Sequence, residues 1–255
     1  MFGFSKKLPL TDKERLWIEE SLLWLLKEFG TDFFLKQQLV LPEARFFPEK
    51  FTGSEECVRN LVNRICQFMD VDTNHVEVEF FSDRELRSGR EKIDGRDGYF
   101  NSAAGLYSHP QSQGERMRIS INESKFRNPT ALVATIAHEL GHVLLLGQRR
   151  ISDKDESHEF LTDLLTVFFG LGIFTANSAF QFSQWQSHSH QGWTASRLGY
   201  MNEEQFAYSL AAYAWMRGDA DCKWRDHLAI NVKAHFKTSL NYLQKGGATS
   251  LKRLR

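Results

Sequence analysis

The sequence predicts one α+β domain, in which a small, mostly antiparallel sheet packs on a zinc-binding pair of helices. Three observations support this class. The 255 residues, 42% of them hydrophobic, fit one large domain with its own core. Helical patterns occupy about 1–70 and about 176–255. Strand-like segments and two apolar helices fall between them, within about 71–175, and this segregation of helices and strands is typical of α+β folds.

The spacing of apolar residues and the capping signals predict the helices. Thr11 with Glu14, and Asn202 with Gln205, have the sequence pattern of a capping box, and Ser54 is a further N-cap. The apolar run "LLTVFFGLGIF" is interpreted as the buried end of a helix. The predicted helices lie at about 12–29, in a short segment ending near 39, and at about 55–69, 129–146, 153–169, 203–217 and 222–244.

Alternating side chains predict the strands. "HVEVEFF", at 75–81, alternates apolar and charged residues, which indicates a strand with one buried face. "YFNSAAGLY", at 99–107, and "RMRISIN", at 116–122, are two further candidate strands joined by a polar loop. These segments supply the predicted sheet.

Composition excludes several classes of protein. Lys+Arg and Asp+Glu balance at 32 each, so no basic surface favours nucleic acid. Three cysteines without a CxxC pair predict no disulfide framework and favour a reducing compartment. The N-terminus has no signal-peptide pattern, and no apolar run approaches the roughly 20 residues that cross a bilayer. We therefore expect a cytoplasmic protein whose partners include neither nucleic acid nor a membrane.

The segment "TIAHELGHVLLLG", at 135–147, carries the chemistry. On a helix, His138 and His142 are about 40° apart in azimuth and about 6 Å apart along the axis, so both imidazoles can bind one zinc ion. Glu139 is rotated by about 100° and lies beside the ion, where it can take a proton from the attacking water. The uncharged flanks and the absence of proline within the helix favour this reading over an ordinary helix with two imidazoles.

A catalytic zinc ion needs a third protein ligand and one open position. The segment "DESHEFLTDLL" offers Glu159 and, four residues later on the same helical face, Asp163. We expect Glu159 to bind the ion and Asp163 to accept a hydrogen bond from the free ring nitrogen of a ligating histidine. Glu156 and Asp163 are alternatives for the third ligand, whereas His158 is expected to point elsewhere.

"HELGH" followed by "EFLTD" resembles the gluzincin zinc peptidases, especially the compact bacterial group that includes the ImmA/IrrE-like proteins. The resemblance covers about residues 117–170. It implies zinc ligation by the two histidines and Glu159, a base role for Glu139, and support of a ligand by Asp163. It also implies a small sheet whose edge strand pairs with an extended peptide, a role for which "RMRISIN" is in the right order.

These features predict a soluble zinc-dependent hydrolase, a metallopeptidase with a protein or peptide substrate. Two alternatives remain: a zinc amidase that cleaves a non-protein amide, and a metal-stabilised scaffold that only binds a partner. Such enzymes use one further donor to stabilise the transition state. Tyr208 and His190 are the expected donors, with His188 and Tyr200 as further candidates.

Overall fold

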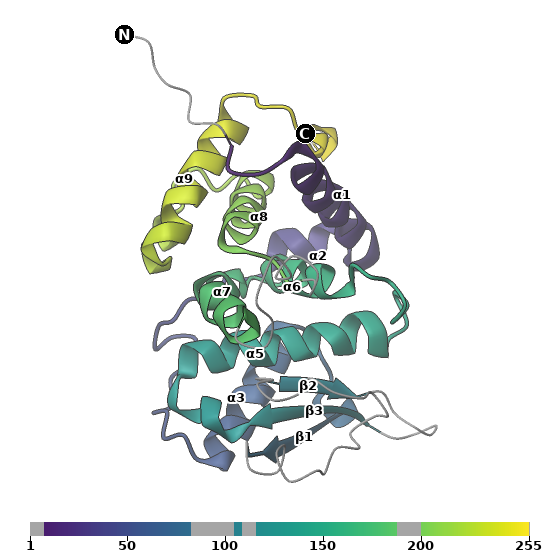
Figure 1. The fold of residues 1–255 in the computed structure, drawn as a ribbon, viewed down its shortest axis with the longest axis vertical. Helices are drawn as coiled ribbons and strands as arrows, with labels where there is room; N and C mark the ends of the chain where they lie inside the picture. The colour runs from purple at the N-terminus through teal and green to yellow at the C-terminus, as the bar shows by residue number, and fades with distance from the viewer. Residues whose placement is uncertain (1–7, 83–104, 109–115, 188–199, 255) are drawn as a thin grey trace.

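The computed structural model describes residues 8–82, 105–108, 116–187 and 200–254. Over these residues the protein is an α+β fold with a sheet at one end and helices stacked above it (Figure 1). The α-helices are α1 (Asp12–Phe29), α2 (Thr31–Lys36), α3 (Glu55–Phe68), α5 (Pro129–His142), α6 (His158–Phe168), α7 (Gly172–Ser187), α8 (Glu203–Met216) and α9 (Ile230–Gln244).

The predicted caps of three helices are confirmed. Thr11 and Glu14 form the capping box of α1, and Ser54 accepts a hydrogen bond from a backbone amide in the first turn of α3. Asn202 and Gln205 form the same box at the start of α8. These local signals are short-range, which is why the sequence alone defines these helix starts well.

The sheet is mixed rather than mostly antiparallel. Its strands are β1 (Val76–Phe81), β2 (Gly105–Ser108) and β3 (Met117–Asn122), in the order β1-β3-β2 among the described residues. β2 and β3 pair antiparallel, whereas β1 runs parallel to β3. Alternation of side chains shows which residues share a face but not which way a neighbouring strand runs, so the sequence could not give the parallel pairing.

Several helix boundaries differ from the sequence expectation. α9 begins at Ile230 rather than near 222, because Lys223–His227 form a 3₁₀-helix before it. α6 begins at His158 rather than near 153, because Asp155 accepts hydrogen bonds from the amide and hydroxyl of Ser157 and so holds the preceding residues in turns. The run "LLTVFFGLGIF" belongs to two helices, since α6 ends at Phe168 and α7 begins at Gly172. Gly170 has φ +79°, a conformation that favours glycine and reverses the chain between them.

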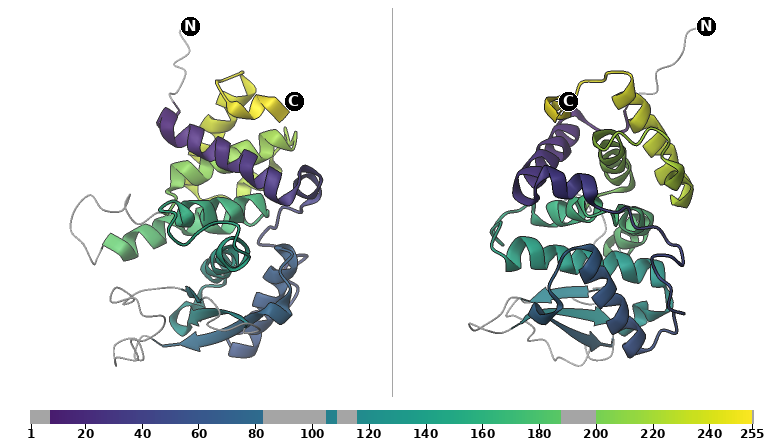
Figure 2. Two further views of the ribbon diagram at one scale, coloured as in Figure 1. Left: turned by 90° about the vertical axis from the view of Figure 1, so that its right-hand side faces the viewer. Right: turned by 180° about the vertical axis from the view of Figure 1, so that it is seen from behind.

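α5 is the central helix of the molecule. It contacts α3, α6, α7 and strand β2. The right-hand view of Figure 2, seen from behind, shows α3 crossing α5. With the π-helical turn Val143–Gly147 that continues it, α5 is long and apolar enough to cross a membrane by length and composition, contrary to the sequence expectation. However, 83% of this stretch is buried inside the protein, as in the core helix of a soluble protein.

Candidate metal centre

Two histidines and one glutamate converge between α5 and α6. His138 and His142 lie one turn apart on α5, and Glu159 lies in the first turn of α6. Each of the three offers one ligand atom, and these atoms lie within 4.8 Å of one another. The two imidazoles are buried and the Glu159 side chain is 23% exposed, so the cluster reaches solvent on the Glu159 side.

The spacing within the cluster suits a single metal ion. Oε2 of Glu159 lies 3.0 Å from Nε2 of His138 and 3.4 Å from Nε2 of His142. Two ligand atoms bound to one tetrahedral zinc ion at 2.0–2.1 Å lie about 3.3 Å apart. Although burial opposes its charge, hydrogen bonds with the two histidines hold the pKa of Glu159 well below its usual range. The carboxylate is therefore ionised and available as a ligand.

Asp163 orients the ring of His138. Its Oδ1 lies 2.9 Å from Nδ1 of His138, and its Oδ2 accepts a hydrogen bond of 2.9 Å from the backbone amide of Met201. With Nδ1 engaged by a carboxylate, Nε2 of His138 faces Glu159. Burial opposes a charge on the ring, but the hydrogen bonds with Asp163 and Glu159 outweigh it and raise the pKa of His138 well above 6.5.

His142 has the lower pKa of the two imidazoles and so favours the neutral form. Burial lowers its pKa below 6.5, in spite of the nearby Glu159 carboxylate. Its Nδ1 lies 3.3 Å from the hydroxyl of Thr162, and its Nε2 faces the same carboxylate oxygen as His138. The sequence did not single out Thr162, because a threonine between two acids on a helix gives no spacing signal of its own.

Glu139 lies on α5 between the two histidines and is buried, with 6% of the residue exposed. Burial raises the pKa of its carboxyl group to about 7, so it can gain or lose a proton near neutral pH. Strand β2 comes unusually close to it. A Cβ atom on Gly105 would lie 2.8 Å from both Cγ and Oε1 of Glu139, so a larger residue there would displace the carboxylate.

Of the three candidate carboxylates, Glu159 is the one that faces both histidines. Glu156 is exposed and precedes α6, while Asp163 contacts the far side of the His138 ring. The expectation that His158 points elsewhere is wrong. Its ring centroid lies 5.8 Å from that of His142 and its Nδ1 lies 3.5 Å from Oε1 of Glu159, because α6 begins at His158 and directs its first turn toward α5.

Tyr208 does not join this cluster, and its expected role as a donor at the metal site is corrected. Its hydroxyl donates to the buried carboxylate of Glu19 on α1. Glu19 also accepts hydrogen bonds from Arg15 and from the backbone amide of Ser250. Tyr208 therefore belongs to a buried network that joins α1, α8 and the C-terminal segment. Because its neighbours are distant in sequence, the apolar pattern of α8 could not reveal this.

Two other tyrosines flank the histidines instead. The ring of Tyr200 lies 5.3 Å from that of His138, and its hydroxyl is hydrogen bonded with Glu159. Burial raises the pKa of Tyr200 well above 10, so it stays a neutral donor. The ring of Tyr107, on β2, lies 5.9 Å from that of His142. The remaining candidates, at positions 188 and 190, are histidines that lie outside the described residues.

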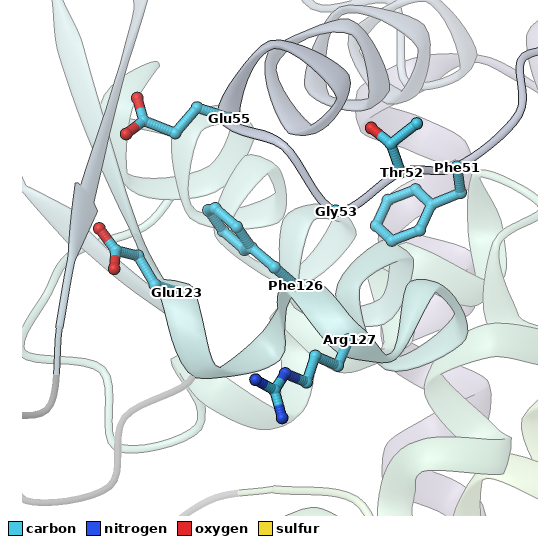
Figure 3. A pocket seen from close by; sticks show the side chains of 7 residues that line it. All are labelled: Phe51, Thr52, Gly53, Glu55, Glu123, Phe126 and Arg127. Atoms are coloured by element: carbon cyan, nitrogen blue, oxygen red, sulfur yellow. The ribbon is translucent and has the colours of Figure 1, made fainter.

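Two cavities lie apart from the histidine cluster. One, of about 610 Å³, is lined by residues around the start of α3 and the segment before α5, including Glu55, Glu123 and Arg127 (Figure 3). These three residues are exposed, so their charges are solvated. The other, of about 560 Å³, borders the same segment of α3. Neither cavity is lined by a residue of the cluster.

Comparisons with known proteins identify no family for this chain. No family model matches the chain, and neither a curated protein nor a solved structure is significantly similar to it. Function therefore has to be inferred from the chemistry of the cluster. Two ring nitrogens and a carboxylate oxygen are a donor set that zinc accepts.

Proposed function

We propose that the protein is a zinc-dependent metallopeptidase that hydrolyses peptide bonds in a protein or peptide substrate. The observation that carries this proposal is the convergence of His138, His142 and Glu159 through three ligand atoms. Glu139 lies buried beside them with a pKa of about 7. A purely structural metal site has no use for such a carboxyl group, so its presence favours an enzyme over a binding scaffold.

The residues fit zinc for a reason that does not depend on the sequence motif. His138 and His142 are each engaged at Nδ1, so that both Nε2 atoms face one oxygen of Glu159. The raised pKa of His138 shows that this arrangement of groups favours a positive charge beside Glu159, which a ring proton supplies when no metal is bound. Zinc would supply that charge, bound by Nε2 of both histidines and by the Glu159 carboxylate.

In the proposed reaction, a zinc ion held by His138, His142 and Glu159 would polarise the substrate carbonyl and lower the pKa of water. The Glu139 carboxylate accepts the proton from the attacking water and then delivers it to the leaving amine. The neutral hydroxyl of Tyr200, beside His138 and Glu159, donates a hydrogen bond to the negative charge that develops on the carbonyl oxygen. Asp163 keeps Nδ1 of His138 engaged throughout.

Strand β2 supports a peptide as the substrate. The expectation that "RMRISIN" forms the edge strand is wrong, because β3 is paired on both sides. β2 is the last strand in the order β1-β3-β2 and lies beside α5. A peptide bound in an extended conformation alongside β2 would suit this arrangement. Since Gly105 adjoins Glu139, the peptide would pass next to the proposed base.

The three free cysteines bear on the cellular compartment in which the protein works. Cys57, Cys66 and Cys222 are all unpaired, and two of them are buried. Burial raises the pKa of the Cys66 and Cys222 thiols to about 12, which keeps them protonated and unreactive. Free cysteines suit a reducing compartment, and we therefore extend the proposal to the cytoplasm.

The test compares the wild-type protein with Glu139→Gln. Each is loaded with zinc, its metal content is measured, and cleavage of casein and of a mixed peptide library is followed by mass spectrometry. We expect one zinc ion per chain in both proteins and a loss of cleavage of about 10²–10⁴-fold in the variant, because a general base contributes about that factor.

Glu156→Gln serves as the matched control, because Glu156 is an exposed carboxylate next to the same helix. It should retain both zinc and cleavage. A wild-type protein that binds no zinc, or a Glu139→Gln variant that cleaves as fast as wild type, would contradict the proposal. Cleavage of small-molecule amides with no cleavage of peptides would favour the amidase instead.

A further inference from the structure

Thr162 lies at the contact between α5 and α6 and is fully buried. Its Oγ1 lies 2.8 Å from the backbone carbonyl oxygen of His158 and 3.3 Å from Nδ1 of His142. None of the roles proposed so far uses this hydroxyl. It is nevertheless in direct contact with one of the two histidines of the cluster, on the side of the ring away from Glu159.

The proton of this hydroxyl can be assigned. A threonine hydroxyl has one proton, and a carbonyl oxygen can only accept a hydrogen bond. The short contact with the carbonyl of His158 therefore takes the proton. Toward His142, Oγ1 can then only accept, which requires the proton of the neutral imidazole to be on Nδ1. In this tautomer Nε2, on the Glu159 side of the ring, carries the lone pair that would bind a metal ion.

A glycine makes this contact feasible. A Cβ atom on Gly141 would lie 2.8 Å from Cγ2 of Thr162, so a side chain there would push α6 away from α5. Gly141 is the fourth residue of "HELGH" and directly precedes His142. The close approach of the helices and the hydrogen bond between Thr162 and His142 thus depend on the same position.

We infer that Thr162 is a positioning residue, which fixes the Nδ1–H tautomer of His142 and so keeps Nε2 free to bind the metal. This inference rests on the proposed zinc site. It assigns to Thr162 the function toward His142 that Asp163, its neighbour in sequence, performs toward His138. Two consecutive residues of α6 thereby orient both histidines of α5.

A neutral acceptor suits this position better than a carboxylate. The cluster already holds the carboxyl groups of Glu139, Glu159 and Asp163, all of them largely withdrawn from solvent. A fourth buried carboxylate would add repulsion that one divalent ion could not balance. A hydroxyl that has already given its proton to a carbonyl accepts a hydrogen bond without adding charge.

The test uses Thr162→Val, which keeps the branched shape and the contact with Gly141 but removes the acceptor. The dissociation constant of zinc is measured by competition with a chelator at fixed pH. We expect Thr162→Val to weaken zinc binding by about 10–100-fold, because loss of a partner that orients a ligand has an effect of that size. Thr162→Ser, which keeps the hydroxyl, should restore binding close to the wild-type value.

Thr166→Val is the matched control. Thr166 lies one turn later on α6, is equally buried, and donates its hydroxyl proton to the carbonyl of Asp163 without contacting a histidine. Its substitution removes a buried hydroxyl from the same helix, but zinc affinity should not change. If Thr162→Val and Thr166→Val bind zinc as tightly as wild type, Thr162 has no positioning role.

A second measurement reports the tautomer of His142 directly. Long-range ¹H–¹⁵N spectra of the metal-free protein report which ring nitrogen of His142 carries the proton. We expect the Nδ1–H form in wild type and in Thr162→Ser, and its loss in Thr162→Val. An Nε2–H form in wild type would overturn the inference. A His142→Ala variant that binds zinc as tightly as wild type would instead show that the proposed metal site, rather than the role of Thr162, is wrong.

Discussion

At the scale of single residues, the direction in which each histidine presents Nε2 depends on the contact that its Nδ1 makes with a residue of α6. The spacing of His138 and His142 follows from the helical repeat and was predictable from the sequence, whereas Glu159 was one of three candidate carboxylates, and the packing of α6 on α5 brings it to both histidines. Tyr107 was not predicted, and Tyr200 was only one of four candidate donors, because both approach the rings from segments that no repeat links to α5. Sequence spacing reports neighbours within a helix, whereas tertiary contacts complete the site.

Glu139 should destabilise the metal-free protein above neutral pH. Burial raises its pKa from 4.5 to about 7 in the folded state, so the folded protein keeps a proton that the unfolded chain releases. Stability attributable to Glu139 is complete below about pH 4.5 and is lost as the pH rises toward 7. Glu139→Gln, which cannot ionise, should therefore be more stable than wild type above pH 7, by on the order of 3 kcal/mol.

Urea unfolding of the two metal-free proteins at pH 4.5 and pH 8 measures this difference. The free energies of unfolding should nearly coincide at pH 4.5 and separate at pH 8. The same substitution at the exposed Glu156 should leave the free energy of unfolding nearly unchanged at both values. An equal effect of Glu139→Gln at both pH values would show that the carboxyl group is not perturbed by burial.

At the scale of elements, the site is made where α6 and the edge strand β2 meet α5. Local signals gave the start of α5, where Asn128 caps the helix and Pro129 is its first residue. They misplaced the start of α6, because Asp155 favours turns as readily as helix starts. Nothing local indicated that the helix turns π-helical after His142, which is a feature found frequently at functional sites.

The approach of β2 to α5 makes Gly105 a sensitive position. Gly105→Ala would place a methyl group 2.8 Å from Glu139 and from Cγ2 of Thr135, so the carboxylate must move. We expect kcat for peptide cleavage to fall by roughly 100-fold, because misplacement of a reacting group by about 1 Å has an effect of that size. The substitution does not touch the proposed zinc ligands, so the zinc content should stay at the wild-type level.

Steady-state kinetics and metal analysis of the same preparations test this prediction. Ser108→Ala, in the same strand, adds no atoms and should retain kcat close to that of wild type. An unchanged kcat in Gly105→Ala would mean that the strand and Glu139 adjust to one another without functional consequence.

At the scale of the whole molecule, the sheet, α5 and the upper helices form successive layers around one buried core (Figure 1). Composition and the order of segments were sufficient to predict the α+β class, because both report how much apolar surface each segment has to bury. The parallel pairing of β1 with β3 and the docking of the C-terminal segment on Glu19 were not predictable. Both join residues that lie far apart in the chain.

The most direct test is a crystal structure of the zinc-loaded protein with anomalous diffraction data collected at the zinc edge. The account predicts one strong peak within about 2.0–2.2 Å of Nε2 of His138, Nε2 of His142 and a carboxylate oxygen of Glu159. An anomalous peak bound to other residues, or no peak in metal-replete crystals, would contradict it.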